Sequence, residues 1–208
     1  LFVFPDGSYG AEGFKKYVRK EEAGKITTAK GKAKKIYRYT LTSSLRKLIQ
    51  GKTHEETLKK LSNFSSKYSE SIKNILKARK EGKSVFIYNE YVGGSGIILF
   101  GAILELFGFT HATGTEPSES KSARYATLTN ETASAKKIRR LVDRFNQPDN
   151  MHGEIINVII GSRKIAEGFS LQNVQIEEIH TPWFNYSETA QAIARGYRLG
   201  SHRMLLET

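Results

Sequence analysis

The sequence predicts an α/β fold in which a mostly parallel sheet is flanked by helices. Strand-like and helix-like segments alternate from residue 84 onward, which is the usual pattern of parallel sheets. The segment at 155–160 is almost purely apolar, as expected for a strand that is covered on both faces. Residues 1–60 differ, because they are rich in Lys, Gly, Ser and Thr and have irregular apolar spacing, and the regular pattern begins at residue 66. We therefore expect a basic, partly irregular N-terminal extension over 1–65 and the α/β domain over 66–208.

Within the extension, residues 2–7 favour a short strand that runs into a turn, and residues 29–39 favour a loop. A helix is predicted over 53–61, with Thr53 as the N-cap and Glu56 as its capping-box partner. Because Thr53 serves as a cap, the string Gly51-Lys52-Thr53 is not expected to be a phosphate-binding loop, and it also lacks the required upstream glycine.

In the α/β domain, Tyr68, Ile72, Ile75 and Leu76 recur at helical spacing and predict one buried helix face. The later elements are predicted in this order: a strand over 84–92, a glycine turn over 93–96, a helix over 97–107 closed by Gly108, a strand over 124–128, a helix over 133–145, a strand over 155–160, a strand over 176–180 and a helix over 187–197.

The formal net charge of +12 favours a polyanionic partner, because bound phosphates release counterions. Residues 30–47 carry seven Lys or Arg and no acid, with Tyr37 and Tyr39 available for base stacking. The expected nucleic-acid contacts in this segment are Lys32, Lys34, Lys35 and Arg38. The chain contains no cysteine, which excludes disulfide scaffolds, cysteine zinc sites and a cysteine nucleophile. No apolar run is long enough to cross a membrane, so no membrane partner is expected.

Two arginines, Arg195 and Arg198, lie three residues apart near the end of a predicted helix and so share one face. A planar guanidinium can clamp phosphate oxygens and stabilise the charge that develops during phosphoryl transfer. The surrounding segment resembles motif VI of superfamily 2 helicases at Gln191, Arg195, Arg198 and Gly200, although the usual glycine is replaced by Ala194. The resemblance implies that Gln191, Arg195 and Arg198 are the catalytic residues.

Three further segments resemble the same family in the same order. Residues 161–174 resemble motif V, which implies that Ser162 contacts a nucleic-acid backbone and that the nucleotide cleft is lined by Glu167, Gly168 and Ser170. Residues 84–92 resemble motif IV, and residues 126–146 resemble the segment between these motifs. There Thr129 is expected to contact phosphate, although Asn130 stands where the family has glycine. Four ordered matches imply a helicase C-terminal, RecA-like lobe.

The strings at 2–14, 87–97 and 181–202 resemble helicases of large cytoplasmic DNA viruses, a group that includes the poxvirus-like early transcription factor ATPase and the nucleoside triphosphate phosphohydrolase. This resemblance implies an ATPase that depends on DNA, or alternatively on RNA, and that acts beside a viral RNA polymerase. The implied locations are the viral factory in the host cytoplasm and the virion.

The sequence has no P-loop and no Asp-Glu pair to hold Mg²⁺, and the family carries both on its first RecA-like lobe. We therefore expect the chain to be part of a longer protein, to use ATP with Mg²⁺ held mainly by that absent lobe, to contain no metal site of its own and to be inactive alone. Two alternatives stay open: a non-catalytic module that docks nucleic acid or polymerase, and a doubly wound enzyme that binds a nucleotide or methyl donor.

Overall fold

The computed structural model describes residues 2–27, 31, 33–162, 169–181 and 205, and its centre is a five-stranded sheet. All neighbouring strands in this sheet are parallel, and their order is β4-β5-β6-β3-β7. The strands are β3 (Ser84–Tyr88), β4 (Thr110–His111), β5 (Arg124–Leu128), β6 (Val158–Gly161) and β7 (Val174–Ile179). The predicted α/β class with a parallel sheet is therefore confirmed, and it is consistent with a RecA-like lobe.

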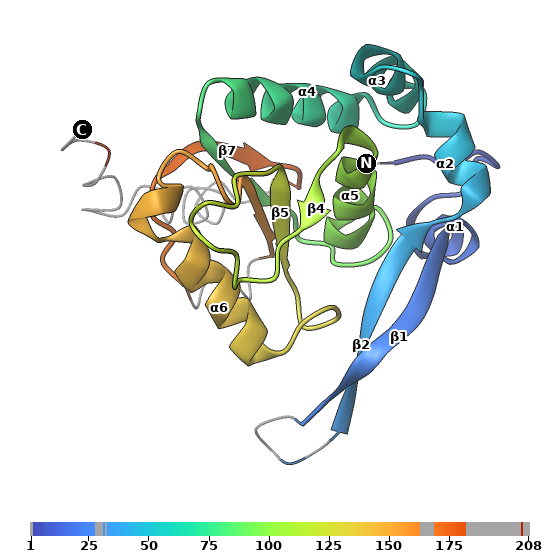
Figure 1. The fold of residues 1–208 in the computed structure, drawn as a ribbon. Helices are drawn as coiled ribbons and strands as arrows, with labels where there is room; N and C mark the ends of the chain where they lie inside the picture. The colour runs from blue at the N-terminus through green and yellow to red at the C-terminus, as the bar shows by residue number, and fades with distance from the viewer. Residues whose placement is uncertain (1, 28–30, 32, 163–168, 182–204, 206–208) are drawn as a thin grey trace.

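Helices cover both faces of the sheet (Figure 1). On one face, α4 (Ser66–Lys80) and α5 (Ile97–Leu104) pack against Val85 and Ile87 of β3. On the other face, α6 (Ala135–Phe145) packs in a second cluster with Phe86. Successive residues of a strand point to opposite faces, so one apolar strand supplies both layers. Each such buried side chain contributes about 1.5–3 kcal/mol.

Hydroxyl side chains fix where the helices begin. Ser65 caps α4 by accepting a hydrogen bond from Tyr68 N (3.1 Å), and Ser134 caps α6 in the same way (3.1 Å to Lys137 N). Thr53 caps α3 (His54–Ser62) through Glu56 N (3.1 Å), as predicted. The carboxylate of Glu56 accepts from Lys52 N (2.8 Å) rather than from the cap residue itself, so the capping box is shifted by one residue.

The N-terminal part is more regular than the sequence predicted. It contains α1 (Gly10–Tyr17), β1 (Val18–Thr27), β2 (Ala33–Leu41) and α2 (Ser43–Ile49). Strands β1 and β2 form an antiparallel hairpin, here called the arm, that extends away from the rest of the protein (Figure 1). The loop predicted over 29–39 was therefore wrong from residue 33 onward. Cross-strand pairing, as between Lys35 and Glu22 (2.7 Å), outweighs the weak strand signal of this basic segment.

Residues 2–65 also supply part of the main core. Phe2 and Phe4 are buried, with ring centres 4.9 Å apart, in the cluster that contains α4 and α5. Phe2 also stacks on Phe64 at 5.9 Å, and Phe4 stacks on Tyr17 at 5.5 Å. The division of the chain at residue 65 stays a prediction, but the two parts share one hydrophobic core.

Two predicted strands are shorter in the structure, and local side chains explain why. The strand predicted over 84–92 ends at Tyr88, because Asn89 Oδ1 accepts a hydrogen bond from Tyr91 N (3.0 Å) and turns the chain. The strand predicted over 155–160 begins only at Val158, because the side chain of Asn150 binds the preceding backbone N–H groups (2.8 and 2.9 Å).

The other elements agree closely with expectation. The predicted helix over 97–107 is α5 followed by a 3₁₀ turn, η1 (Glu105–Phe107), and Gly108 ends it with a φ of 83°. The helix predicted over 187–197 lies outside the described residues. Within the described ranges, no helix has the length and apolarity needed to span a lipid bilayer.

Candidate functional site

Four polar side chains lie in a row at the carboxyl edge of the sheet. Leu128, Gly161, Tyr88 and Ile179 are aligned across β5, β6, β3 and β7. The residues that directly follow them are all polar, and all are buried: Thr129, Ser162, Asn89 and His180. Neighbouring strands are about 4.8 Å apart, so the row crosses the edge where parallel α/β sheets bind ligands. We call these four residues the edge row.

The edge row unites two residues that the sequence predicted and two that it missed. Thr129 and Ser162, predicted to contact nucleic acid, are adjacent but are only 2% and 8% exposed. Asn89 and His180 were not predicted as site residues. The available signal was the same for each: a polar residue directly after an apolar strand.

The loop after β3 carries an exposed aromatic side chain. Tyr91 is 60% exposed and follows the turn made by Asn89. Gly96 is required here, because a Cβ at this position would lie 2.0 Å from the carbonyl oxygen of Tyr91. Exposed aromatic rings can stack on bases, so Tyr91 is a further candidate contact.

His180 is held from several sides. Its Nε2 lies 2.9 Å from Ser71 Oγ on α4, and the rings of Phe100 and Tyr68 pack against its imidazole. Its backbone N–H donates to Tyr88 O (2.8 Å), and its carbonyl accepts from Lys67 Nζ (2.5 Å). The end of β7 is therefore fixed in position. Beyond it, Thr181 Oγ1 accepts from the backbone N–H of Glu90 (2.7 Å), which joins this segment to the loop after β3.

Glu131 connects the arm to the edge row. Its carbonyl accepts a hydrogen bond from Tyr37 N (3.0 Å), and its carboxylate accepts from Tyr39 Oη (3.3 Å). Its own backbone N–H donates to Thr129 Oγ1 (3.2 Å). The arm is thus attached at its base to the loop that contains one of the predicted phosphate contacts.

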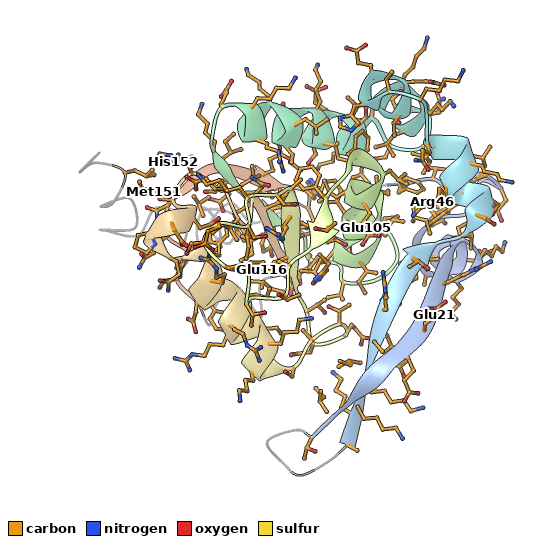
Figure 2. The ribbon with its side chains drawn as sticks, in the orientation of Figure 1. Glu21, Arg46, Glu105, Glu116, Met151 and His152 are labelled. Carbon is orange, nitrogen blue, oxygen red and sulfur yellow. The ribbon has the colours of Figure 1, made fainter. Side chains whose placement is uncertain are left out.

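The arm presents the predicted cations unequally. Arg38 is exposed, Lys34 is half-buried, and Lys35 is paired with Glu22 (2.7 Å). Lys32 lies outside the described residues. The rings of Tyr37 and Tyr39 form cation–π contacts within the arm, because Lys20 Nζ lies 3.8 Å from the centre of the Tyr37 ring and 5.7 Å from that of Tyr39. Side chains of both charges line the arm, including the labelled Glu21 (Figure 2).

Among the predicted nucleotide-cleft residues, only Ser170 is described. It is exposed, and its carbonyl accepts a hydrogen bond from Asn146 Nδ2 (2.9 Å) at the end of α6. The Oδ1 atom of Asn146 also accepts from Gln172 N (2.8 Å), so one side chain fixes this segment beside α6. The other predicted cleft and catalytic residues lie outside the described residues: Glu167, Gly168, Gln191, Arg195 and Arg198.

In the middle of β7, in register with Phe86 of β3, burial raises the pKa of Glu177 from its ordinary 4.5 to about 7. Neither of its carboxylate oxygens has a hydrogen-bond partner within the described part of the chain. The described residues contain no cluster of three or more His, Asp or Glu side chains that could hold a metal ion.

Comparison with curated proteins gives consistent relatives. The chain is 41% identical over 204 residues to a helicase candidate, 087L, of Invertebrate iridescent virus 3, a match that covers 98% of this chain and 18% of the relative. It is 33% identical over 202 residues to an ATP-dependent RNA helicase candidate of Heliothis virescens ascovirus 3e, which covers 97% of this chain and 19% of that one. It is 26% identical over 177 residues to the early transcription factor large subunit homolog of African swine fever virus, covering 76% and 16%.

The chain therefore spans about a fifth of the length of the first two of these relatives. No protein-family model and no solved structure matches it.

Proposed function

Because this chain is related over nearly its whole length to a segment of helicase-like proteins of large DNA viruses, we propose that it is the second motor lobe of an ATP-dependent nucleic-acid helicase or translocase. The observation that carries the proposal is the edge row. It places the ends of the motif-bearing strands β3, β5 and β6 side by side at the carboxyl edge of one parallel sheet.

The proposed catalytic role belongs to the segment after β7. This strand ends at the carboxyl edge, and the chain continues past Thr181 toward Gln191, Arg195 and Arg198. We assign the two arginines to the phosphates of an ATP whose Mg²⁺ and P-loop contacts come from another lobe. Arginine suits this role because its charge persists at all working pH values and its planar fork matches phosphate oxygens.

Nucleic-acid binding is assigned to the arm and to the loops of the edge row. Lys34 and Arg38 on the arm, with Lys32, supply cations, and Ser162 and Thr129 supply hydroxyl groups. Both hydroxyls are buried, so they can bind the phosphate backbone of a nucleic acid only if the loops open. Otherwise the main-chain N–H groups of Thr129 and Ser162 would donate to the phosphates instead. The link at Glu131 would transmit movement of one contact region to the other.

A role in viral transcription follows from the African swine fever virus relative, which is named as an early transcription factor subunit. We propose a viral RNA polymerase as the partner of the full protein and DNA as its substrate. The location would then be the viral factory or the virion.

The test compares ATP hydrolysis with nucleic-acid binding in the full protein. Arg198→Ala should reduce kcat for ATP by at least about a hundredfold, because arginine fingers contribute about 10³–10⁵ to such rates. Its affinity for DNA should change less than about threefold, because Arg198 is assigned to the phosphates of ATP and its loss removes no contact with a DNA phosphate. Hydrolysis at the wild-type rate in Arg198→Ala would refute the arginine-finger role, and the absence of hydrolysis in the wild-type full protein would favour the non-catalytic docking module.

A further inference from the structure

A groove at the opposite edge of the sheet is distinct from the edge row. It lies between α3 and α4 and reaches Phe107, Phe109 and Ala123, which precede β4 and β5. Its volume is about 630 Å³, within the range of about 300–1,000 Å³ that accommodates ligands. The groove therefore borders the amino ends of the strands, whereas the edge row lies at their carboxyl ends.

The floor of the groove is apolar and its rim is cationic. Leu58 on α3 and Leu76 on α4 are half-buried and face it, above the buried rings of Phe107 and Phe109. The rim carries four cationic side chains from α4 and one carboxylate from α3; they are Lys73, Lys77, Arg79, Lys80 and Glu55.

The cations are only partly neutralised by their own helix. Lys73 lies 3.5 Å from Glu70, and Lys77 lies 3.8 Å from Glu81, both on exposed pairs that solvent screens. In the part of the chain that the structure describes, Lys80 forms no ion pair. The rim thus retains positive charge around an apolar floor.

We propose that this groove docks an acidic amphipathic segment of a partner protein, with one or two bulky apolar side chains seated on Leu58 and Leu76 and carboxylates facing the α4 cations. Charge complementarity selects this occupant, because the rim is net positive and the whole chain carries a charge of +12. An apolar anchor in a groove surrounded by charged pairs is a common mode of peptide recognition.

Nucleic acid fits the groove less well than such a peptide. Base stacking needs exposed ring faces, but Phe107 and Phe109 are only 3% and 2% exposed. The exposed ring in the lining is that of His54, whose centre lies 5.5 Å from that of Phe107, and the half-buried apolar side chains of the floor are the two leucines. This inference does not depend on the proposed motor function, since the groove and the edge row share no residue.

The test uses the full chain and a fluorescein-labelled peptide in which Leu and Phe are flanked on both sides by Glu. Fluorescence anisotropy should show saturable binding that weakens with added salt. Leu76→Glu should weaken it at least about tenfold, because it places a carboxylate in the floor. The matched control Leu48→Glu changes an exposed leucine on α2, outside the groove, and should change affinity less than about twofold.

A charge variant keeps the proposal testable if Leu76→Glu fails to fold. The triple variant Lys73→Glu, Lys77→Glu, Lys80→Glu alters only exposed side chains and should also lose about tenfold in peptide affinity while keeping its affinity for DNA. The proposal is overturned if the wild-type chain does not bind the peptide, or if a version with Lys in place of Glu binds equally well. Loss of DNA binding with unchanged peptide binding in the triple variant would instead assign the groove to nucleic acid.

Discussion

Replacing Glu177 with Gln should stabilise the protein, and the gain should depend on pH. The carboxylate is half-buried on β7, and neither of its oxygens has a hydrogen-bond partner among the described residues. Burial raises its pKa to about 7. The folded protein therefore holds a proton there that the unfolded chain releases above its ordinary pKa of 4.5. Below pH 4.5 this carboxyl group does not lower the free energy of unfolding. The free energy of unfolding falls as the pH rises from 4.5 toward 7, and the destabilisation is complete above 7.

The size of the effect follows from the same values. Each pH unit between the two pKa values corresponds to about 1.4 kcal/mol, so the displacement from 4.5 to about 7 sets an upper bound near 3 kcal/mol. Solvent screens a half-buried carboxylate, which reduces the expected gain of Glu177→Gln to about 1–2 kcal/mol at pH 8. At pH 4 the variant and the wild type should have the same free energy of unfolding.

Urea denaturation at pH 4, 6 and 8 measures this difference, with Glu119→Gln as the control because Glu119 is exposed in the loop before β5. The control should stay within about 0.5 kcal/mol of the wild type at each pH. An equal effect of Glu177→Gln at pH 4 and pH 8, or a loss of stability at pH 8, would refute the proposed cost of burying this charge.

Three further predictions concern the fold around the site. Asn150→Ala should lower the free energy of unfolding by about 3 kcal/mol in urea titrations, because it leaves several buried backbone groups without partners; a loss below about 1 kcal/mol would contradict this. Burial lowers the pKa of His111, so stability should fall as the pH drops below about 6.5, and His111→Asn should reduce that slope in melts at pH 7.5 and 5.5. Gly96→Ala should cost at least about 2 kcal/mol through its clash with Tyr91 O, whereas Gly93→Ala, with open space around it, should cost less than about 0.5 kcal/mol; equal melting temperatures for the two would contradict the role of Gly96.

The parallel sheet was predictable because its strands and helices have clear periodicity and clear caps. The segment at 155–160 is apolar at every position but one, and Ser134 and Thr53 stand where their helices begin. Strand ends were less predictable, because they depend on side chains that form hydrogen bonds with backbone groups. Asn89 and Asn150 each accept such hydrogen bonds, and residue propensities alone do not predict them.

The arm was missed for a different reason. Its strands are rich in charged residues, which are uncommon in strands, and their placement is stabilised by contacts between residues far apart in sequence, such as that of Tyr39 with Glu131 (3.3 Å). Thr129 and Ser162, the two described residues that the motifs assign to nucleic-acid contact at the sheet, both follow strands at the carboxyl edge. Their contact with nucleic acid stays a prediction. The sequence did not predict that the arm would be attached to the same loop.

Hydrogen exchange of the full protein, with and without DNA and a non-hydrolysable ATP analogue, tests the central claim most directly. We predict slower exchange on ligand binding in the arm, over 33–41, and in the loops of the edge row, over 89–96 and 129–133. We also predict slower exchange over 169–173, the segment before β7 that contains the predicted cleft residue Ser170, with no change along α3 and α4. Protection confined to α3 and α4, with unchanged exchange at the carboxyl edge, would contradict it.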